Sequence, residues 1–188
     1  MDNLMPCVGL FGTCGNSRWR DPFIQRFASQ NIAYFNPQVE AGTWHAGLVE
    51  AENSHFVEDD IILFPVTDET TGQGSLAEIG FSIANALRCN ANRFFVFLIE
   101  DECNDPDASD EARAESVRSR RLVKSKLMQI AATLDNVFLV ESLGDMMTVS
   151  LKLAELLRVK AKIGQDFRES MHVITGFSRP SREAACHH

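Results

Sequence analysis

The sequence has few cysteines, a single tyrosine and no long apolar run. Its five cysteines are odd in number, and none forms a Cys-x-x-Cys pair or a Cys/His cluster. These absences argue against a disulfide framework and a zinc site, and they favour a reducing compartment. No apolar run approaches the roughly 18 residues of a membrane-spanning helix. The first residues also lack the basic region of a secretory signal, so we expect a cytoplasmic protein.

Positive charge is also scarce. The chain has 18 Lys and Arg residues against 26 Asp and Glu residues, which gives a formal net charge of −8. This balance argues against nucleic acid or an anionic membrane as the main partner. It leaves a small-molecule ligand open, because the local charge of a pocket can differ from the net charge.

Five short apolar runs alternate with segments of helical periodicity. The runs cover 7–12, 32–37, 61–66, 93–100 and 136–142, and helices are expected over 21–30, 46–59, 75–87, 111–134 and 145–162. Apolar strands separated by helices predict a parallel sheet covered on both faces. The expected fold class is α/β, a single flavodoxin- or Rossmann-like three-layer sandwich with a five-stranded parallel sheet. Ligands of such folds bind at the carboxyl ends of the strands, where the strand order reverses.

The chain length of 188 residues favours one domain with an appendage. We place the α/β domain at 1–163 and a C-terminal arm or tail at 164–188, because the tail lacks a clear period. The charged segment 111–134 is interpreted as a solvated face or a subunit interface. We also expect a homo-oligomer, as is common for small α/β enzymes.

The loop "FGTCGNSRWR" follows the first predicted strand. Its glycines allow a close approach of the backbone to a ligand, and its two arginines are suited to a phosphate. The spacing does not match the dinucleotide fingerprint Gly-x-Gly-x-x-Gly. The alternative is an ordinary connecting loop with surface arginines. The candidate substrate-binding residues of this loop are Phe11, Gly12, Thr13, Gly15, Asn16, Arg18, Trp19 and Arg20.

The stretch "TDETTGQGSLAEIG" follows the third predicted strand and carries three acids. Asp68 and Glu69 lie in the loop, and Glu78 lies in the first turns of the next helix. There the helix dipole is expected to lower its pKa, and an ionised glutamate is a suitable nucleophile for an anomeric carbon. Alternatively, Glu78 is the capping-box partner of Ser75. Both interpretations of Glu78 remain open at this point.

Further candidates lie on neighbouring segments. Glu52, on the second predicted helix, could orient a sugar hydroxyl or carry a proton, whereas His55 is interpreted as a surface or hydrogen-bonded histidine. Trp44 offers a flat face for stacking. The remaining candidate substrate contacts are Asn36 and Pro37 at the end of the second strand, and Gly74 and Ser75 before Glu78.

Three of these stretches together resemble the nucleoside 2-deoxyribosyltransferase-like family. They are "FGTCGNSRWRDPFIQRF", "YFNPQV" and "DIILFPVTDETTGQGSLAEIGFSIANAL", and the similarity spans about residues 8–100. The resemblance implies cleavage or transfer at the N-glycosidic bond of a nucleoside or nucleotide, without a cofactor or metal. It also implies that Glu78 is the nucleophile, that Asp68 or Glu69 manages the proton of the leaving base, and that Glu52 is a second acid of the site.

The sequence departs from that family in two places. The expected tyrosine after the first strand is missing, since the only tyrosine is Tyr34, and the C-terminal segment does not resemble the family's. Cleavage is therefore better founded than base exchange. Two alternatives remain: a non-catalytic nucleotide-binding sensor or regulatory module, and an NAD-glycohydrolase.

Overall fold

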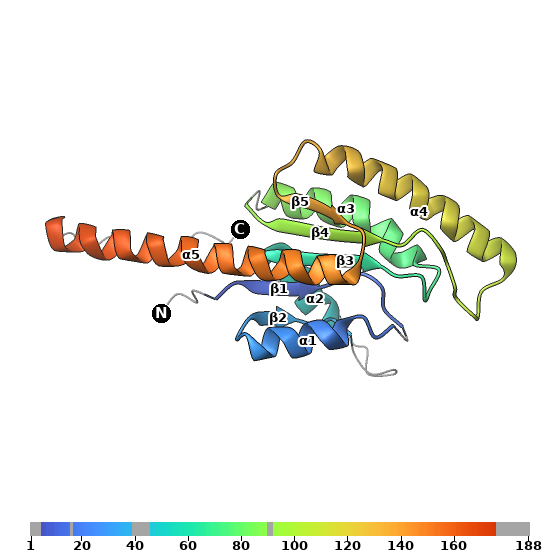
Figure 1. Cartoon of the computed structure of the whole chain (residues 1–188), viewed down its shortest axis with the longest axis horizontal. Coiled ribbons are helices and arrows are strands. Elements are labelled where there is room, and N and C mark those ends of the chain that lie inside the picture. The colour runs from blue at the N-terminus through green and yellow to red at the C-terminus, as the bar shows by residue number, and fades with distance from the viewer. Residues whose placement is uncertain (1–4, 16, 39–45, 90–91, 176–188) are drawn as a thin grey trace.

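The computed structural model describes residues 5–15, 17–38, 46–89 and 92–175. Strands and helices alternate along the chain (Figure 1). In order they are β1 (Cys7–Leu10), α1 (Arg20–Ser29), β2 (Ala33–Phe35), α2 (Ala46–Glu58), β3 (Ile61–Val66), α3 (Gln73–Cys89), β4 (Phe94–Ile99), α4 (Asp110–Ala131), β5 (Val137–Val140) and α5 (Leu143–Thr175).

The five strands form one parallel sheet in the order β2-β1-β3-β4-β5. The predicted fold class is thereby confirmed. The strand order reverses at β1, because the chain passes from β1 to β2 on one side and returns to β3 on the other. The carboxyl ends of β1 and β3 therefore form the edge where ligands of such sheets bind.

Alternate side chains of β3 point into two separate hydrophobic cores, as expected for a strand buried on both faces. Ile61 and Leu63 pack with residues of α1 and α5, whereas Ile62 and Phe64 pack with residues of α3 and α4. The helices thus form one layer on each face of the sheet (Figure 1).

Some helix ends differ from the expectations. The helix expected from residue 21 begins one residue earlier, at Arg20, so Asp21 lies in its first turn, and the preceding Trp19 makes no side-chain capping bond. At the other end of the chain, α5 continues to Thr175, through part of the segment that we interpreted as an arm. The domain division at residue 163 stays a prediction. Within the described ranges, no helix is both long and apolar enough to span a bilayer.

Candidate functional site

The loop after β1 is fixed to the end of β3. The backbone N–H of Thr13 donates to the carbonyl of Pro65 at 2.8 Å, and the N–H of Thr67 donates to the Thr13 hydroxyl at 2.9 Å. The Thr13 hydroxyl also donates to the Pro65 carbonyl, and the hydroxyls of Ser17 and Thr67 lie 3.5 Å apart. These bonds hold the two loops of the predicted binding edge against each other.

Two glycines shape this loop in different ways. Gly12 has a φ of +91°, and a Cβ atom there would lie 2.3 Å from the carbonyl oxygen of Pro65. Gly15 also has a positive φ, +75°, but a Cβ atom there would meet no atom of the residues that the structure describes within 4 Å. Gly12 is therefore required by the contact between the loops, whereas Gly15 leaves its corner open to a ligand.

Arg20 is buried and organises the loop from inside. Its guanidinium donates to the carbonyls of Leu10 at 2.9 Å and Thr13 at 2.6 Å, and it stacks over the ring of Trp19 at 4.5 Å. Arg18, in contrast, is exposed and pairs with Asp21 at 2.6 Å. The guanidinium of Arg20 thus binds the backbone of the loop, and its contact with a phosphate stays a prediction.

The fold brings Glu52 of α2 and Glu78 of α3 into electrostatic contact beside Arg20. Glu78 lies exposed on α3, but partial desolvation of its carboxyl raises its pKa, and the nearby Glu52 carboxyl raises it further. Burial also raises the pKa of Glu52, and the positive charge of Arg20 opposes that rise. The sequence predicted a lowered pKa for Glu78 at the helix start. That prediction is wrong, because desolvation and the second carboxyl outweigh the helix dipole.

The capping-box interpretation of Glu78 is also wrong. The helix α3 begins at Gln73, so Ser75 lies inside the helix and is not its cap. The N–H of Leu76 already donates to the carbonyl of Gly72 at 2.9 Å. Glu78 therefore has no capping role, and a cap does not account for its position near Glu52.

The other two acids of the predicted site lie elsewhere. Asp68 faces the loop after β4, where its carboxylate accepts a hydrogen bond from the Asn104 side chain and its N–H donates to Glu100 at 2.6 Å. Glu69 is exposed and accepts a bond of 3.2 Å from the Thr67 hydroxyl. The structure thus places Glu52 near Glu78, whereas Asp68 is hydrogen-bonded to Asn104.

The remaining candidates are distributed between the core and the surface. Phe11 and Trp19 are buried in the two hydrophobic cores. The Asn36 side chain accepts from the N–H of Gln38 at 3.1 Å, and Pro37 is half-buried beside it. Gly74 is exposed and Ser75 half-buried in the first turn of α3. Asn16 and Trp44 lie outside the described residues.

Arg120 is a residue that sequence reasoning missed. We interpreted its helix as a solvated face or an interface, but Arg120 is fully buried. It donates to the carbonyls of Val66 at 3.1 Å, Thr67 at 2.8 Å and Thr70 at 2.6 Å, and so fixes the loop that leads into α3. The sequence signal that could have identified Arg120 as buried is its spacing of seven residues, about two helical turns, from the buried Leu127.

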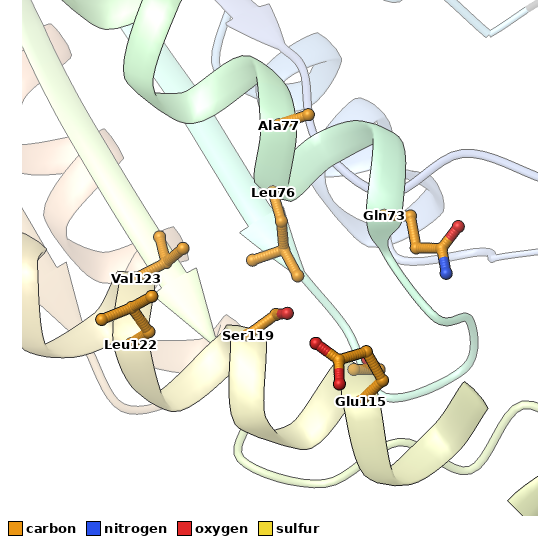
Figure 2. A pocket seen from close by; sticks show the side chains of 8 residues that line it. Gln73, Leu76, Ala77, Glu115, Ser119, Leu122 and Val123 are labelled. Atoms are coloured by element: carbon orange, nitrogen blue, oxygen red, sulfur yellow. The ribbon is translucent and has the colours of Figure 1, made fainter. Parts of the chain in front are cut away.

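A separate pocket of about 300 Å³ lies between α3 and α4 (Figure 2). Gln73, Leu76 and Ala77 of α3 line it together with residues of α4 that include Glu115 and Ser119. None of the predicted site residues that the structure describes lines this pocket. It is therefore distinct from the edge that carries Glu52 and Glu78.

Comparison with known proteins supports the fold and little else. No family model and no curated protein matches the chain. A solved structure described as the RPS4 and RRS1 TIR domain heterodimer is similar, with a TM-score of 0.50 and 8% sequence identity. The match covers 82% of this chain and 99% of that one. At this identity the likeness shows a shared α/β fold alone.

These findings overturn the resemblance to the nucleoside 2-deoxyribosyltransferase-like family. No family model supports it, and the similar solved structure is a TIR domain. The transferase or hydrolase class drawn from that resemblance is contradicted with it. What the comparisons leave standing is an α/β protein with the flavodoxin-like arrangement of TIR domains.

Proposed function

We propose that the protein binds NAD at the carboxyl ends of β1 and β3 and hydrolyses the bond between its ribose and nicotinamide. The observation that carries this proposal is the electrostatic influence of the half-buried Glu52 carboxyl on the exposed Glu78 carboxyl, with the buried Arg20 beside Glu52. Paired carboxyls with perturbed pKa values are typical of sites that cleave glycosidic bonds.

In the proposed reaction, water attacks C1′ of the nicotinamide ribose. The electrons of the C1′–N bond move onto the pyridinium nitrogen, which leaves as neutral nicotinamide. ADP-ribose and one proton are the other products. The ionised carboxylate of Glu78 stabilises the positive charge that develops on the ribose. Glu52 orients a ribose hydroxyl or takes up the proton of the attacking water.

The position of the other acids favours a cationic substrate. A neutral nucleoside releases its base readily only when an acid protonates the base. Of the two acids expected for this role, Asp68 is hydrogen-bonded to Asn104, and Glu69 accepts from the Thr67 hydroxyl. The nicotinamide of NAD already carries positive charge and leaves without a proton. A site in which both neighbouring acids, Glu52 and Glu78, act on the ribose and neither protonates the base is therefore suited to NAD.

The test is to incubate the protein with NAD and to measure free nicotinamide by chromatography. We expect release by the native protein, and a loss of at least a hundredfold in the Glu78→Gln variant because the stabilising charge is gone. Glu50→Gln, on the exposed surface of α2, is the matched control and should retain activity. Equal release by Glu78→Gln and the native protein would contradict the proposal.

A second candidate is a non-catalytic nucleotide-binding module. The open corner at Gly15 favours it, because a ligand can approach the backbone there whether or not any bond is broken. In that case NAD would bind and be recovered intact. Calorimetric titration beside the chromatography separates the two functions.

We also propose that the protein forms homo-oligomers and works in the cytoplasm. Support for self-association comes from the outer part of α5, where Leu156, Val159, Ile163 and Phe167 are exposed. Their spacings of three, four and four residues are those of a seam between two packed helices. The similar TIR structure is itself described as a heterodimer.

A further inference from the structure

A cluster of three metal-binding side chains lies at the opposite end of β1 from the proposed NAD site. Cys7 is the first residue of β1, His55 lies in the last turn of α2, and Asp59 follows that helix. One donor atom from each, a sulfur, a ring nitrogen and a carboxylate oxygen, lies within 4.8 Å of the other two.

Asp59 provides an independent sign that a ligand belongs here. Its side chain is only 3% exposed, yet its Oδ2 atom accepts no hydrogen bond from the residues that the structure describes. Leaving a buried carboxylate oxygen without a partner is costly. The other oxygen, Oδ1, lies 2.9 Å from Nδ1 of His55. The carboxylate is thus held in place with one oxygen still available.

Hydrogen bonds hold the backbone around Cys7 and Asp59, and the His55 ring packs against a neighbour. The N–H of Cys7 donates to the carboxylate of Asp60 at 3.0 Å, and the N–H of Asp60 donates to the Cys7 carbonyl at 3.0 Å. Arg93 donates to the carbonyl of Asp59, and the His55 ring stacks on Phe35 with centroids 3.8 Å apart. Such support is what orients the ligands of protein metal sites.

Gly9 leaves the space that the carboxylate occupies. A Cβ atom at this position would lie 2.8 Å from Oδ2 of Asp59. Gly9 is two residues from Cys7, so both lie on the same face of β1. A larger residue at position 9 would contact the Phe11 ring, at 2.3 Å from its Cβ atom, as well as the carboxylate, so one of these two side chains would have to move.

The charges favour a divalent cation. The carboxylate of Asp59 lies beside the Cys7 thiol, and the carboxylate of Asp60 accepts a hydrogen bond from the Cys7 N–H. A bound cation would neutralise this crowded negative charge and replace the thiol proton. Arg93 already contacts the backbone at this point, but its guanidinium donates to carbonyl groups.

From these contacts we infer that Cys7, His55 and Asp59 bind a zinc-type divalent ion. Thiolate, imidazole and carboxylate together are a donor set typical of Zn²⁺, which is held at about 2.0–2.3 Å by each ligand. The donors need to close by about an ångström to reach those lengths. The half-exposed His55 side chain can make this movement. A fourth position remains for water on the exposed side of His55.

The test uses the full-length reduced protein without nucleotide, titrated with Co²⁺ as a spectroscopic substitute for Zn²⁺. We expect one equivalent to bind, with a thiolate-to-cobalt absorption band and release of about one proton. Zn²⁺ should then displace the Co²⁺. The Cys7→Ser variant should lose the thiolate band, and Asp59→Asn should bind at least tenfold more weakly.

Cys14→Ser is the matched control, since Cys14 is an exposed cysteine at the other end of β1. It should bind Co²⁺ as the native protein does. His55→Ala changes a half-exposed side chain and tests the site even if Cys7→Ser does not fold. The inference is overturned if the native protein shows no thiolate band, or if His55→Ala keeps native affinity. Because no nucleotide is present, failure here is independent of the proposed NAD hydrolysis.

Discussion

At the scale of single residues, the two carboxyls of Glu52 and Glu78 are coupled. Each has a pKa raised mainly by burial, and the charge of Glu52 adds to the rise at Glu78. A carboxyl with a raised pKa keeps its proton to a higher pH than the ordinary glutamate value of about 4.3. Since the proposed reaction needs ionised Glu78, activity should fall as the pH drops through that raised pKa.

The coupling predicts a shift in the pH profile. Glu52→Gln removes a negative charge, so Glu78 should ionise at a lower pH than in the native protein. The shift should be modest, because burial is the larger cause and is unchanged. NMR titration of the Glu78 side-chain carboxyl carbon measures this directly, without enzyme activity. A shift to higher pH, or none, would contradict the coupling.

A second prediction at this scale concerns two glycines. Gly12→Ala should lower the free energy of unfolding by about 1–3 kcal/mol or more, because φ is +91° and the Cβ atom would contact the Pro65 carbonyl. Gly74→Ala should be neutral or stabilising by up to about 1 kcal/mol, since it lies in α3 with nothing within 4 Å. Chemical denaturation of the two variants tests the contrast. Equal effects would show that the Gly12 contact has no energetic importance.

At the scale of secondary-structure elements, Arg120 joins α4 to the carboxyl ends of the central strands. Its guanidinium reaches carbonyls of the loop between β3 and α3 and the Glu100 carbonyl after β4. Three of these carbonyls belong to the segment from the end of β3 to the start of α3, the helix that carries Glu78. The position of the α3 start therefore depends on a side chain from a helix that does not touch the proposed substrate.

Arg120→Ala should lower the free energy of unfolding by about 3 kcal/mol or more, because several buried carbonyls would lose their donor. The adjacent Arg121 is exposed, and Arg121→Ala should change the free energy of unfolding by no more than about 0.5 kcal/mol. Denaturant unfolding of both variants measures the difference. Two equally small effects would mean that water replaces the guanidinium.

The strands and helices were accessible from the sequence because their patterns are local. All six residues of β3 are buried, as its unbroken apolar run predicted. The start of α3 was missed by two residues, because Gln73 and Gly74 carry no start signal and the turn depends on Gly72 with φ +63°. That small error is what made a capping box seem available to Ser75.

The candidate site was only partly accessible from sequence. The loops after the first and third strands were assigned to one edge because these strands commonly flank the point where the strand order reverses, as β1 and β3 do here. The environment of each charge depends on distant residues, however. Arg20 lies beside Glu52 and Asp68 beside Asn104 through contacts over more than 30 positions. The cluster of Cys7, His55 and Asp59 has no recognisable spacing for the same reason.

At the scale of the whole molecule, the two proposed sites lie at opposite ends of the sheet. Cys7 begins β1, and the loop with Gly12 follows its end, so one short strand separates them. A metal ion at one end would anchor the start of β1 and the end of α2. Glu52 lies one helical turn before His55 on that same α2.

Self-association is the prediction that belongs to this scale. If α5 pairs with α5 of a second copy, Ile163→Glu together with Phe167→Glu should convert oligomers to monomers, because charges would enter an apolar seam. Light scattering after size-exclusion chromatography gives the mass of each species. A control pair on the same helix, Lys160→Glu and Lys162→Glu, should leave the mass unchanged. An unaltered oligomer in the Ile163 and Phe167 variant would place the interface elsewhere.

The length of α5 has a consequence for how the molecule moves in solution. Its 33 residues span about 50 Å at a rise of about 1.5 Å each, and Figure 1 shows the helix running past the sheet. A compact chain of this size has a radius of gyration of about 16 Å, so the helix is longer than the equivalent sphere is wide. Rotation about the helix axis should therefore be faster than rotation across it. Amide bonds of α5, which lie nearly parallel to that axis, should report the slower tumbling in relaxation measurements.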